Sequence, residues 1–252
     1  MLNNQVVAVT GGAGLIGSTL TRTIVEAGGK VIIGDVSVDK GMDLQNELGL
    51  DHTLFVDFDT TDVDSIDNFI ECGKKHFGRI DSAVHSAYPK SQQWGKKFEE
   101  LKPEGLQQDL FNQLGGAILF SQRIIEEFKS KQNGNLIHVG SIQGSATPKF
   151  EHYQGTNMVS PIEYSAIKAG IISITRYLAK YCKGSGIRVN CVGPGGILDN
   201  QPEQFLVKYK ASCNEKGMLD ADDIVGAIIF LLSDASRFIT GQNIIIDDGW
   251  SL

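Results

Sequence analysis

Short runs of β-branched residues alternate along the chain with longer segments of helical spacing. The strand-like runs are Val6–Thr10, Lys30–Asp35, Leu54–Asp57, Ile80–His85, Leu136–Val139, Arg188–Val192 and Asn243–Asp247. The helical segments, whose apolar positions share one face, are Gly17–Ala27, Asp64–Phe77, Leu106–Lys131, Glu163–Lys183 and Asp222–Leu232. Strands and helices that alternate in this order form a parallel sheet with helices on both faces. The pattern therefore predicts an α/β fold with seven parallel strands.

The chain shows no linker, internal repeat or low-complexity tract, so a single domain over residues 1–252 is predicted. Two stretches lack regular periodicity. We call residues 145–161 the insertion and residues 195–217 the lid segment, which contains a short predicted helix near Pro202–Tyr209. Both follow predicted strands, and in a doubly wound Rossmann sheet the carboxyl ends of the strands form the ligand-binding edge. Both stretches are therefore expected beside a bound ligand.

Composition narrows the possible functions. The chain has 252 residues, 41% hydrophobic and 21% charged, and its net charge of −7 disfavours nucleic acid as a partner. The longest apolar run, near Ile228–Leu232, is far too short for a membrane span. The N-terminal residues carry no basic leader, so a cytoplasmic protein is expected. Four cysteines and five histidines are scattered, which predicts free thiols and no metal site.

A glycine-rich loop follows the first predicted strand. Gly12, Gly14 and Gly17 fit the pattern G-x-G-x-x-G, and Gly11, Gly14 and Gly17 are spaced evenly as well. Glycines allow a tight turn close to a pyrophosphate, and the N–H groups of the following helix bind phosphate oxygens. An ordinary glycine turn also fits this motif when it is taken alone. The candidate cofactor contacts here are Gly11, Gly14, Leu15, Ile16 and Gly17.

An acidic residue ends the second predicted strand. Asp35 lies 18 residues beyond Gly17, where a carboxylate accepts hydrogen bonds from the ribose hydroxyls of a dinucleotide. The same carboxylate would repel a 2′-phosphate, and no Arg directly follows it. The position therefore predicts NAD rather than NADP, with a solvated strand-end carboxylate as the plain alternative.

A Tyr and a Lys open a long predicted helix. Tyr164 and Lys168 lie four residues apart and so share one helix face. A phenol is a poor base at neutral pH, and a nearby ammonium lowers its pKa, which suits proton exchange with an alcohol or carbonyl. Such a pair is a common accident on a helix surface. A catalytic role for the pair is supported here because Ser141 directly follows the fifth predicted strand and Asn112 lies in the preceding predicted helix.

Taken in order, these parts resemble the short-chain dehydrogenase/reductase family over nearly the whole chain. Further matching segments are Asn190–Gly195, Ile239–Gln242 and Asp247–Trp250. The resemblance implies a Rossmann fold and an NAD-dependent oxidoreductase that transfers a hydride between nicotinamide and a secondary alcohol or ketone. Members usually form homotetramers through the helices that carry Asn112 and Tyr164, and through the C-terminal strand.

The resemblance also implies roles for individual residues. Tyr164 would be the acid/base, Lys168 would lower its pKa and hold the nicotinamide ribose, and Ser141 would bind the substrate oxygen. Asn112 would hold a water in a proton relay behind Lys168. Further cofactor contacts would be Asp59 and Thr60 at the adenine, Ser86 and Ala87 at the adenosine ribose, and Pro194, Gly195 and Ile197 at the nicotinamide.

The chain departs from the family pattern at four places. Its glycine spacing is closer to that of longer members, and His85–Tyr88 replaces Asn-Asn-Ala-Gly. The segment Gly196–Asp199 lacks the Thr that often contacts the carboxamide. Ser141 and Tyr164 are 23 residues apart, where about a dozen is common in the family.

The insertion accounts for that longer gap. It mixes aromatic rings with Lys, Glu, His, Gln and Asn, a combination that suits a hydroxylated ligand such as a sugar. Together with Gly195–Glu203 it resembles a bacterial subgroup linked to surface-sugar and flagellin-modification pathways. A tolerated surface loop is the alternative. We expect Lys149–Met158 to line the substrate pocket together with residues near Ile197–Gln204, and Trp94 and Trp250 to serve packing or subunit contacts.

Two other functions stay open. One is a 3-oxoacyl-thioester reductase of the same family, which usually prefers NADP and needs basic groups for its carrier. Asp35 and the net charge of −7 disfavour it. The other is a non-catalytic nicotinamide-binding regulator. Such proteins tend to lose the Tyr or the Lys, whereas both are present here.

Overall fold

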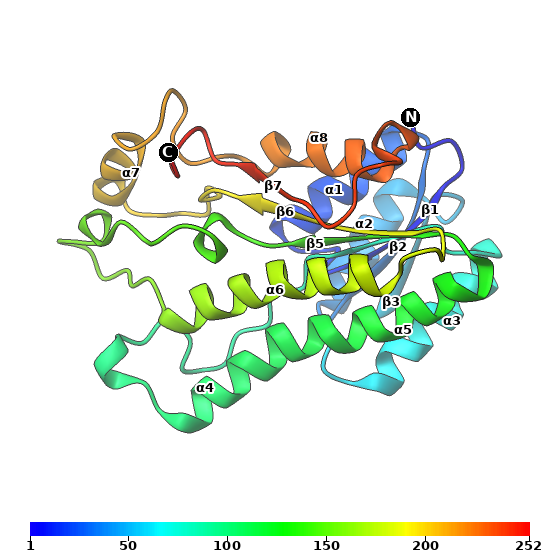
Figure 1. Cartoon of the computed structure of the whole chain (residues 1–252), viewed down its shortest axis with the longest axis horizontal. Helices are drawn as coiled ribbons and strands as arrows, with labels where there is room; N and C mark the ends of the chain where they lie inside the picture. The colour runs from blue at the N-terminus through cyan, green and yellow to red at the C-terminus, as the bar shows by residue number, and fades with distance from the viewer.

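The computed structural model describes residues 1–252 and contains one seven-stranded parallel sheet (Figure 1). The strands are β1 (Val6–Thr10), β2 (Lys30–Asp35), β3 (Thr53–Asp57), β4 (Ser82–His85), β5 (Gly134–Val139), β6 (Ile187–Pro194) and β7 (Asn243–Ile246). Their order across the sheet is β3-β2-β1-β4-β5-β6-β7. Strand order therefore reverses between β1 and β4, which places the ligand crevice of a doubly wound sheet above these two strands.

Helices cover both faces of the sheet. They are α1 (Leu15–Glu26), α2 (Val38–Leu48), α3 (Val63–Phe77), α4 (Pro103–Asp109), α5 (Gly116–Lys131), α6 (Ile162–Tyr181), α7 (Glu203–Lys210) and α8 (Ala221–Leu232). Helices α1, α2 and α8 pack on one face, and α3, α5 and α6 pack on the other (Figure 1). The central strands β1 and β5 are buried along their whole length, which explains why β1 is almost continuously apolar, while β5 also buries Asn135 and His138. The doubly wound Rossmann fold predicted from the sequence is confirmed.

Several predicted boundaries move. The strand expected from Ile80 begins at Ser82, and β6 runs on to Pro194. Helix α2 was not predicted, because its sequence is mostly polar and only Gly41 and Leu44 are buried. The single helix predicted over Leu106–Lys131 is three segments, since a π-helical turn over Leu110–Gly115 separates α4 from α5.

The insertion and the lid segment lie together beyond the carboxyl ends of the strands, at the left of Figure 1. The insertion contains a short 3-10 turn, Phe150–His152, which contacts α7 of the lid segment. No helix has the length and apolar character needed to cross a membrane. The four cysteines are free thiols.

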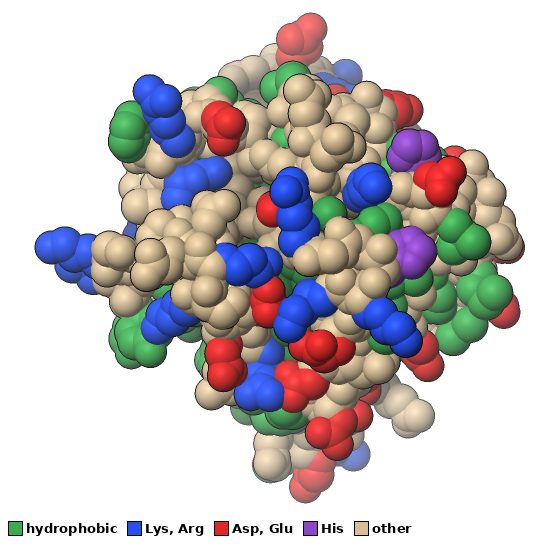
Figure 2. Space-filling view, turned by 90° about the vertical axis from the view of Figure 1, so that its right-hand side faces the viewer, with side chains coloured by type: hydrophobic (Ala, Val, Ile, Leu, Met, Phe, Trp, Pro, Cys, Tyr) green, Lys and Arg blue, Asp and Glu red, His purple; other side chains and the backbone are tan.

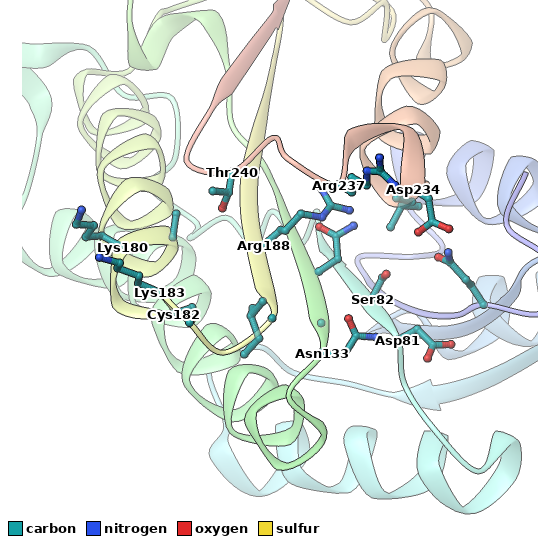
Figure 3. A pocket seen from close by; sticks show the side chains of 18 of the residues that line it. Asp81, Ser82, Asn133, Lys180, Cys182, Lys183, Arg188, Asp234, Arg237 and Thr240 are labelled. Atoms are coloured by element: carbon teal, nitrogen blue, oxygen red, sulfur yellow. The ribbon is translucent and has the colours of Figure 1, made fainter.

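The opposite, amino edge of the sheet carries a polar hollow of about 740 Å³ (Figure 3). Lys and Arg side chains gather over the middle of this face (Figure 2), and those that line the hollow include Lys180, Lys183, Arg188 and Arg237. Arg188 donates hydrogen bonds to the carbonyl oxygens of Leu231 at 2.9 Å and Ile239 at 3.4 Å. This guanidinium therefore ties the start of β6 to the end of α8 and to the turn before β7.

Candidate active site

A cavity of about 990 Å³ opens at the carboxyl edge of the sheet, beneath the insertion and the lid segment. Every candidate cofactor residue lines it. These residues are Gly11, Gly14, Leu15, Ile16, Gly17, Asp35, Asp59, Thr60, Ser86, Ala87, Tyr164, Lys168, Pro194, Gly195 and Ile197. The cavity extends past them to the insertion, so it has room for a dinucleotide and a substrate.

The glycine loop leaves no space for side chains at two positions. A Cβ at Gly17 would lie 2.0 Å from the carbonyl oxygen of Gly11, and a Cβ at Gly11 would lie 2.9 Å from the backbone of Ala87. Gly11 also has a φ of 65°, which disfavours other residues. Gly14 is the N-cap of α1 and offers no side-chain cap, so the first N–H groups of this helix, which have no intrahelical partner, remain available to a ligand. This close, N–H-rich loop fits a pyrophosphate.

Asp35 lies on the cavity wall beside the glycine loop. Its Oδ2 accepts the N–H of Ala13 at 3.0 Å and its Oδ1 accepts the N–H of Ser37 at 2.9 Å. These bonds hold the carboxylate beside the glycine loop, and each oxygen keeps a lone pair for a ribose hydroxyl. The buried hydroxyl of Thr60, which also lines the cavity, has no hydrogen-bond partner.

The structure brings three of the four candidate catalytic residues to the cavity wall. Ser141 follows β5, and its Oγ accepts the N–H of Gln143 at 3.2 Å, which leaves the hydroxyl proton free for another partner. Tyr164 and Lys168 project from the first turns of α6. The Nζ of Lys168 donates to the carbonyl oxygen of Val139 at 3.1 Å and lies 5.5 Å from the centroid of the Tyr164 ring.

Asn112 is the exception. It lies in the π-helical turn that packs against α6, and it does not line the cavity. A π-helical turn changes the direction in which its side chains project, and such turns are frequent at functional sites. Any role of Asn112 must therefore be exerted from outside the cavity wall, and its part in a proton relay stays a prediction.

Burial is the main influence on the pKa of both Tyr164 and Lys168. In the protein chain, burial raises the pKa of the Tyr164 phenol, although the neighbouring Ser141 hydroxyl acts in the opposite direction. These causes do not include Lys168, so the lowering of the phenol pKa by this ammonium stays a prediction. Loss of solvation is the largest effect on both pKa values. Both groups are buried at the cavity, and burial disfavours the phenolate of Tyr164 and the ammonium of Lys168. Burial likewise lowers the pKa of Lys168 to about 8.

The insertion supplies part of the substrate side. His152, Tyr153 and Met158 line the cavity, as do the residues that lead back to α6. Gln143 Nε2 donates to the Tyr153 hydroxyl at 3.4 Å, and the Ser160 hydroxyl donates to Gln143 Oε1 at 3.0 Å. This wall therefore combines an aromatic ring with a string of hydrogen-bonding groups.

Not all of the insertion lines the cavity. Lys149 instead donates to the carbonyl oxygen of Trp250 at 2.8 Å and packs on its indole ring, and Phe150 is exposed. From the lid segment, Ile197, Asp199, Gln201 and Phe205 reach the wall. The Gly196–Asp199 stretch without Thr is held by a bridge between Ile197 and Leu219.

Sequence reasoning missed two groups of wall residues. Trp94 and Trp250 line the cavity besides packing. Tyr88 lines it as well, with its ring 5.8 Å from that of Tyr164. The only sequence signal for Tyr88 was that it stands where the resembled family has Gly.

Residues 11–251 match the family described as Enoyl-(Acyl carrier protein) reductase. The chain is 42% identical to the post-translational flagellin modification protein A of Campylobacter coli over the full length of both proteins. It is 31% identical to the 7alpha-hydroxysteroid dehydrogenase of Bacteroides fragilis, over 99% of this chain and 95% of that one. A solved short chain dehydrogenase from Leptospira borgpetersenii with bound NAD+ has a TM-score of 0.86 at 31% identity, covering 99% of this chain and 94% of that chain.

Proposed function

The chain belongs to the short-chain dehydrogenase/reductase family of oxidoreductases, and from this premise we propose that it transfers a hydride between NAD(H) and a secondary alcohol or ketone. The observation that carries the proposal is that Ser141, Tyr164 and Lys168 share one cavity with the glycine loop and Asp35. An acid/base pair and a dinucleotide cradle in the same cavity are what this chemistry requires. Bound NAD(H) would accept or supply the hydride.

The residues of the chain would handle the substrate oxygen and its proton. In the reduction, the Ser141 hydroxyl donates a hydrogen bond to the carbonyl oxygen, and the Tyr164 phenol gives its proton to that oxygen as the carbonyl carbon is reduced. In the oxidation, the proton returns from the alcohol to Tyr164. The ammonium of Lys168 favours the phenolate that exists between these events. The attraction between the ammonium and the phenolate is stronger in a buried cavity than in bulk water, because charges are screened less there.

The substrate class we propose is a sugar or sugar derivative. Tyr153 offers a ring face, while Gln143, Ser160, Asp199 and Gln201 offer hydrogen-bonding groups on the same cavity. Hydroxylated rings are bound by this combination of apolar and polar groups. The resemblance to a flagellin modification protein of Campylobacter coli supports the same class.

An acyl-thioester reductase is the second candidate, because the matched family is described as Enoyl-(Acyl carrier protein) reductase. One assay separates the two candidates. Oxidation or reduction of a panel of sugar alcohols and keto-sugars is compared with reduction of an enoyl thioester and of a 3-oxoacyl thioester, each with both cofactors. A sugar-type substrate with the higher kcat/KM supports the proposal, and a thioester with the higher kcat/KM contradicts it.

Asp35 should make NAD the preferred cofactor. Its carboxylate would bind the ribose hydroxyls of NAD and repel the 2′-phosphate of NADP. We expect Asp35→Ala to weaken NAD binding by about tenfold, the size of one charge-assisted hydrogen bond, and to narrow the gap to NADP. Fluorescence titration with both cofactors measures this. Asp35→Asn keeps the size of the side chain and serves as the matched control for charge, and wild-type protein that binds NADP as tightly as NAD would contradict the assignment.

We also propose a homotetramer. The apolar residues Ile167 and Ile171 on α6 are buried within the chain's own core, so they cannot form the subunit contact. Exposed apolar side chains are present nearby, at Ile118 on α5 and Tyr181 on α6. Sedimentation equilibrium at micromolar concentration should give the tetramer mass, and Ile118→Arg should lower it, whereas Val207→Arg on the exposed face of α7 should not. A wild-type monomer would count against this assembly.

A further inference from the structure

The catalytic lysine is a buried cation without a carboxylate partner. Only 8% of Lys168 is exposed, and its one hydrogen bond goes to the carbonyl oxygen of Val139. Burial of an ammonium without an opposite charge favours the neutral amine. A neutral Lys168 could not stabilise a phenolate on Tyr164. Any group that favours the charged form would therefore support proton exchange at Tyr164.

The titratable groups around Lys168 do not supply that charge. His85 on β4, His138 on β5 and Cys191 on β6 face it across the sheet edge. Burial lowers the pKa of both imidazoles and raises the pKa of the Cys191 thiol to about 12, so all three are neutral near pH 8. Two phenols also lie close to Lys168, Tyr164 on the same helix and Tyr88 on the loop after β4. The buried carboxyl groups of Asp109 and Glu163 act on Tyr88, but neither makes an ion pair with Lys168.

The rings of these two tyrosines lie at nearly equal distances from the ammonium. The Nζ of Lys168 is 5.4 Å from the centroid of Tyr88 and 5.5 Å from that of Tyr164. Both distances are within the range of a cation–π interaction, whose strength increases when the cation is desolvated. Exposed Lys90 also lies over the Tyr88 ring, at 4.8 Å, so this ring serves one cation from solvent and one from the cavity.

Trp94 fixes the arrangement of the two tyrosine rings. The three rings meet edge to face, with centroid distances of 5.5 Å for Tyr88–Trp94, 5.8 Å for Tyr88–Tyr164 and 6.1 Å for Trp94–Tyr164. The interplanar angles are 85°, 75° and 83°. Edge-to-face packing is the favoured geometry for aromatic pairs. These contacts hold the Tyr88 ring beside Lys168, although 39% of the residue is exposed.

We propose that Tyr88 is a positioning residue whose ring, together with that of Tyr164, holds the ammonium of Lys168 in its charged form. The glycine that the family has at this position could not do so, because it has no ring. The functional consequence rests on the proposed dehydrogenase activity, since a charged Lys168 is what favours proton exchange at Tyr164. The charge state itself does not depend on that activity and is tested separately.

The test is competitive labelling of the whole protein with trace acetic anhydride across pH 6 to about 10.5, the range around a lysine pKa. The extent of labelling at Lys168, read by mass spectrometry, gives the midpoint of its titration without cofactor or substrate. We expect a wild-type midpoint at or above 8, because burial lowers this pKa to about 8 and the two rings act in the opposite direction. Tyr88→Leu should lower it by about one pH unit, whereas Tyr88→Phe, which keeps the ring, should leave it unchanged.

Two outcomes would overturn the proposal. One is a Lys168 midpoint in Tyr88→Leu that equals that of the wild type. The other is a midpoint lowered as much in Tyr88→Phe as in Tyr88→Leu, which would assign the effect to the hydroxyl. Circular dichroism checks that the variants are folded, and Tyr88→Met is a second ringless variant if the leucine variant is not. The two proposals can fail separately. If Tyr88→Leu lowers the midpoint but the wild-type protein is inactive on every alcohol, the role of Tyr88 is supported and the proposed function is contradicted.

Discussion

Replacing Tyr164 with Phe should lower turnover by about 10²–10⁴-fold, the usual contribution of a general acid/base. The change removes only the phenolic oxygen that exchanges a proton with the substrate. The ring stays, so the edge-to-face contacts with Tyr88 and Trp94 are kept. The dinucleotide cradle, at Gly11–Gly17 and Asp35, lies elsewhere in the cavity. NAD affinity should therefore be nearly unchanged.

The measurement is single-turnover reduction of the best ketone found in the substrate panel, in which chemistry rather than product release is observed. NAD binding is measured on the same samples by fluorescence titration. Lys168→Ala gives the contrast, because it should weaken both the rate and the affinity for the cofactor. Near-normal single-turnover rates in Tyr164→Phe would show that another group exchanges the proton.

The sheet and most of the site could be predicted because they depend on local sequence. Strands such as Val6–Thr10 and Lys30–Asp35 are short apolar runs bounded by turn residues, and their ends match the prediction. The carboxyl ends of parallel strands share one edge, so Ser141 and the glycine loop had to lie near each other. Tyr164 and Lys168 are four residues apart, so the prediction of a helix was enough to place them on the same face.

The remaining features depend on packing between distant segments. Trp250 contacts Lys149 across 101 residues, a pairing that no local pattern records. The π-helical turn that keeps Asn112 off the cavity wall has no signature in apolar spacing. The direction of the Tyr164 pKa depends on how deeply the folded chain buries the phenol, which the spacing to Lys168 does not reveal.

The insertion and the lid segment are joined by a buried aromatic cluster. His152 is 2% exposed, and its ring lies 5.6 Å from Tyr209 and 5.9 Å from Trp250. Its Nε2 makes a hydrogen bond of 2.9 Å with the Ser212 hydroxyl, and Lys208 donates to the carbonyl oxygen of Gln154 at 2.6 Å. These contacts hold α7 over the cavity. The insertion therefore shapes the substrate side both directly, through Tyr153, and indirectly, through the lid segment.

Replacing Thr147–Val159 with a brief Gly-containing link should abolish activity on the native substrate and leave NAD affinity nearly unchanged. The deletion removes Tyr153 and Met158 from the wall and frees α7, while the glycine loop and Asp35 stay in place. Binding energy from groups remote from the reacting carbon orients a substrate and so contributes to turnover. Activity on a small generic alcohol, if the enzyme has any, should be affected least.

The matched control for this deletion is Lys208→Gln, which loses only the outer contact to Gln154 and leaves the cavity wall unchanged. It should keep most of the wild-type kcat/KM. The comparison requires a deletion variant that is folded and saturable with NAD, shown by circular dichroism and fluorescence titration. If such a variant acted on the native substrate with unchanged kcat/KM, the insertion would be a surface loop. The proposal of a sugar-type substrate would then lose the contacts at Tyr153 on which it depends.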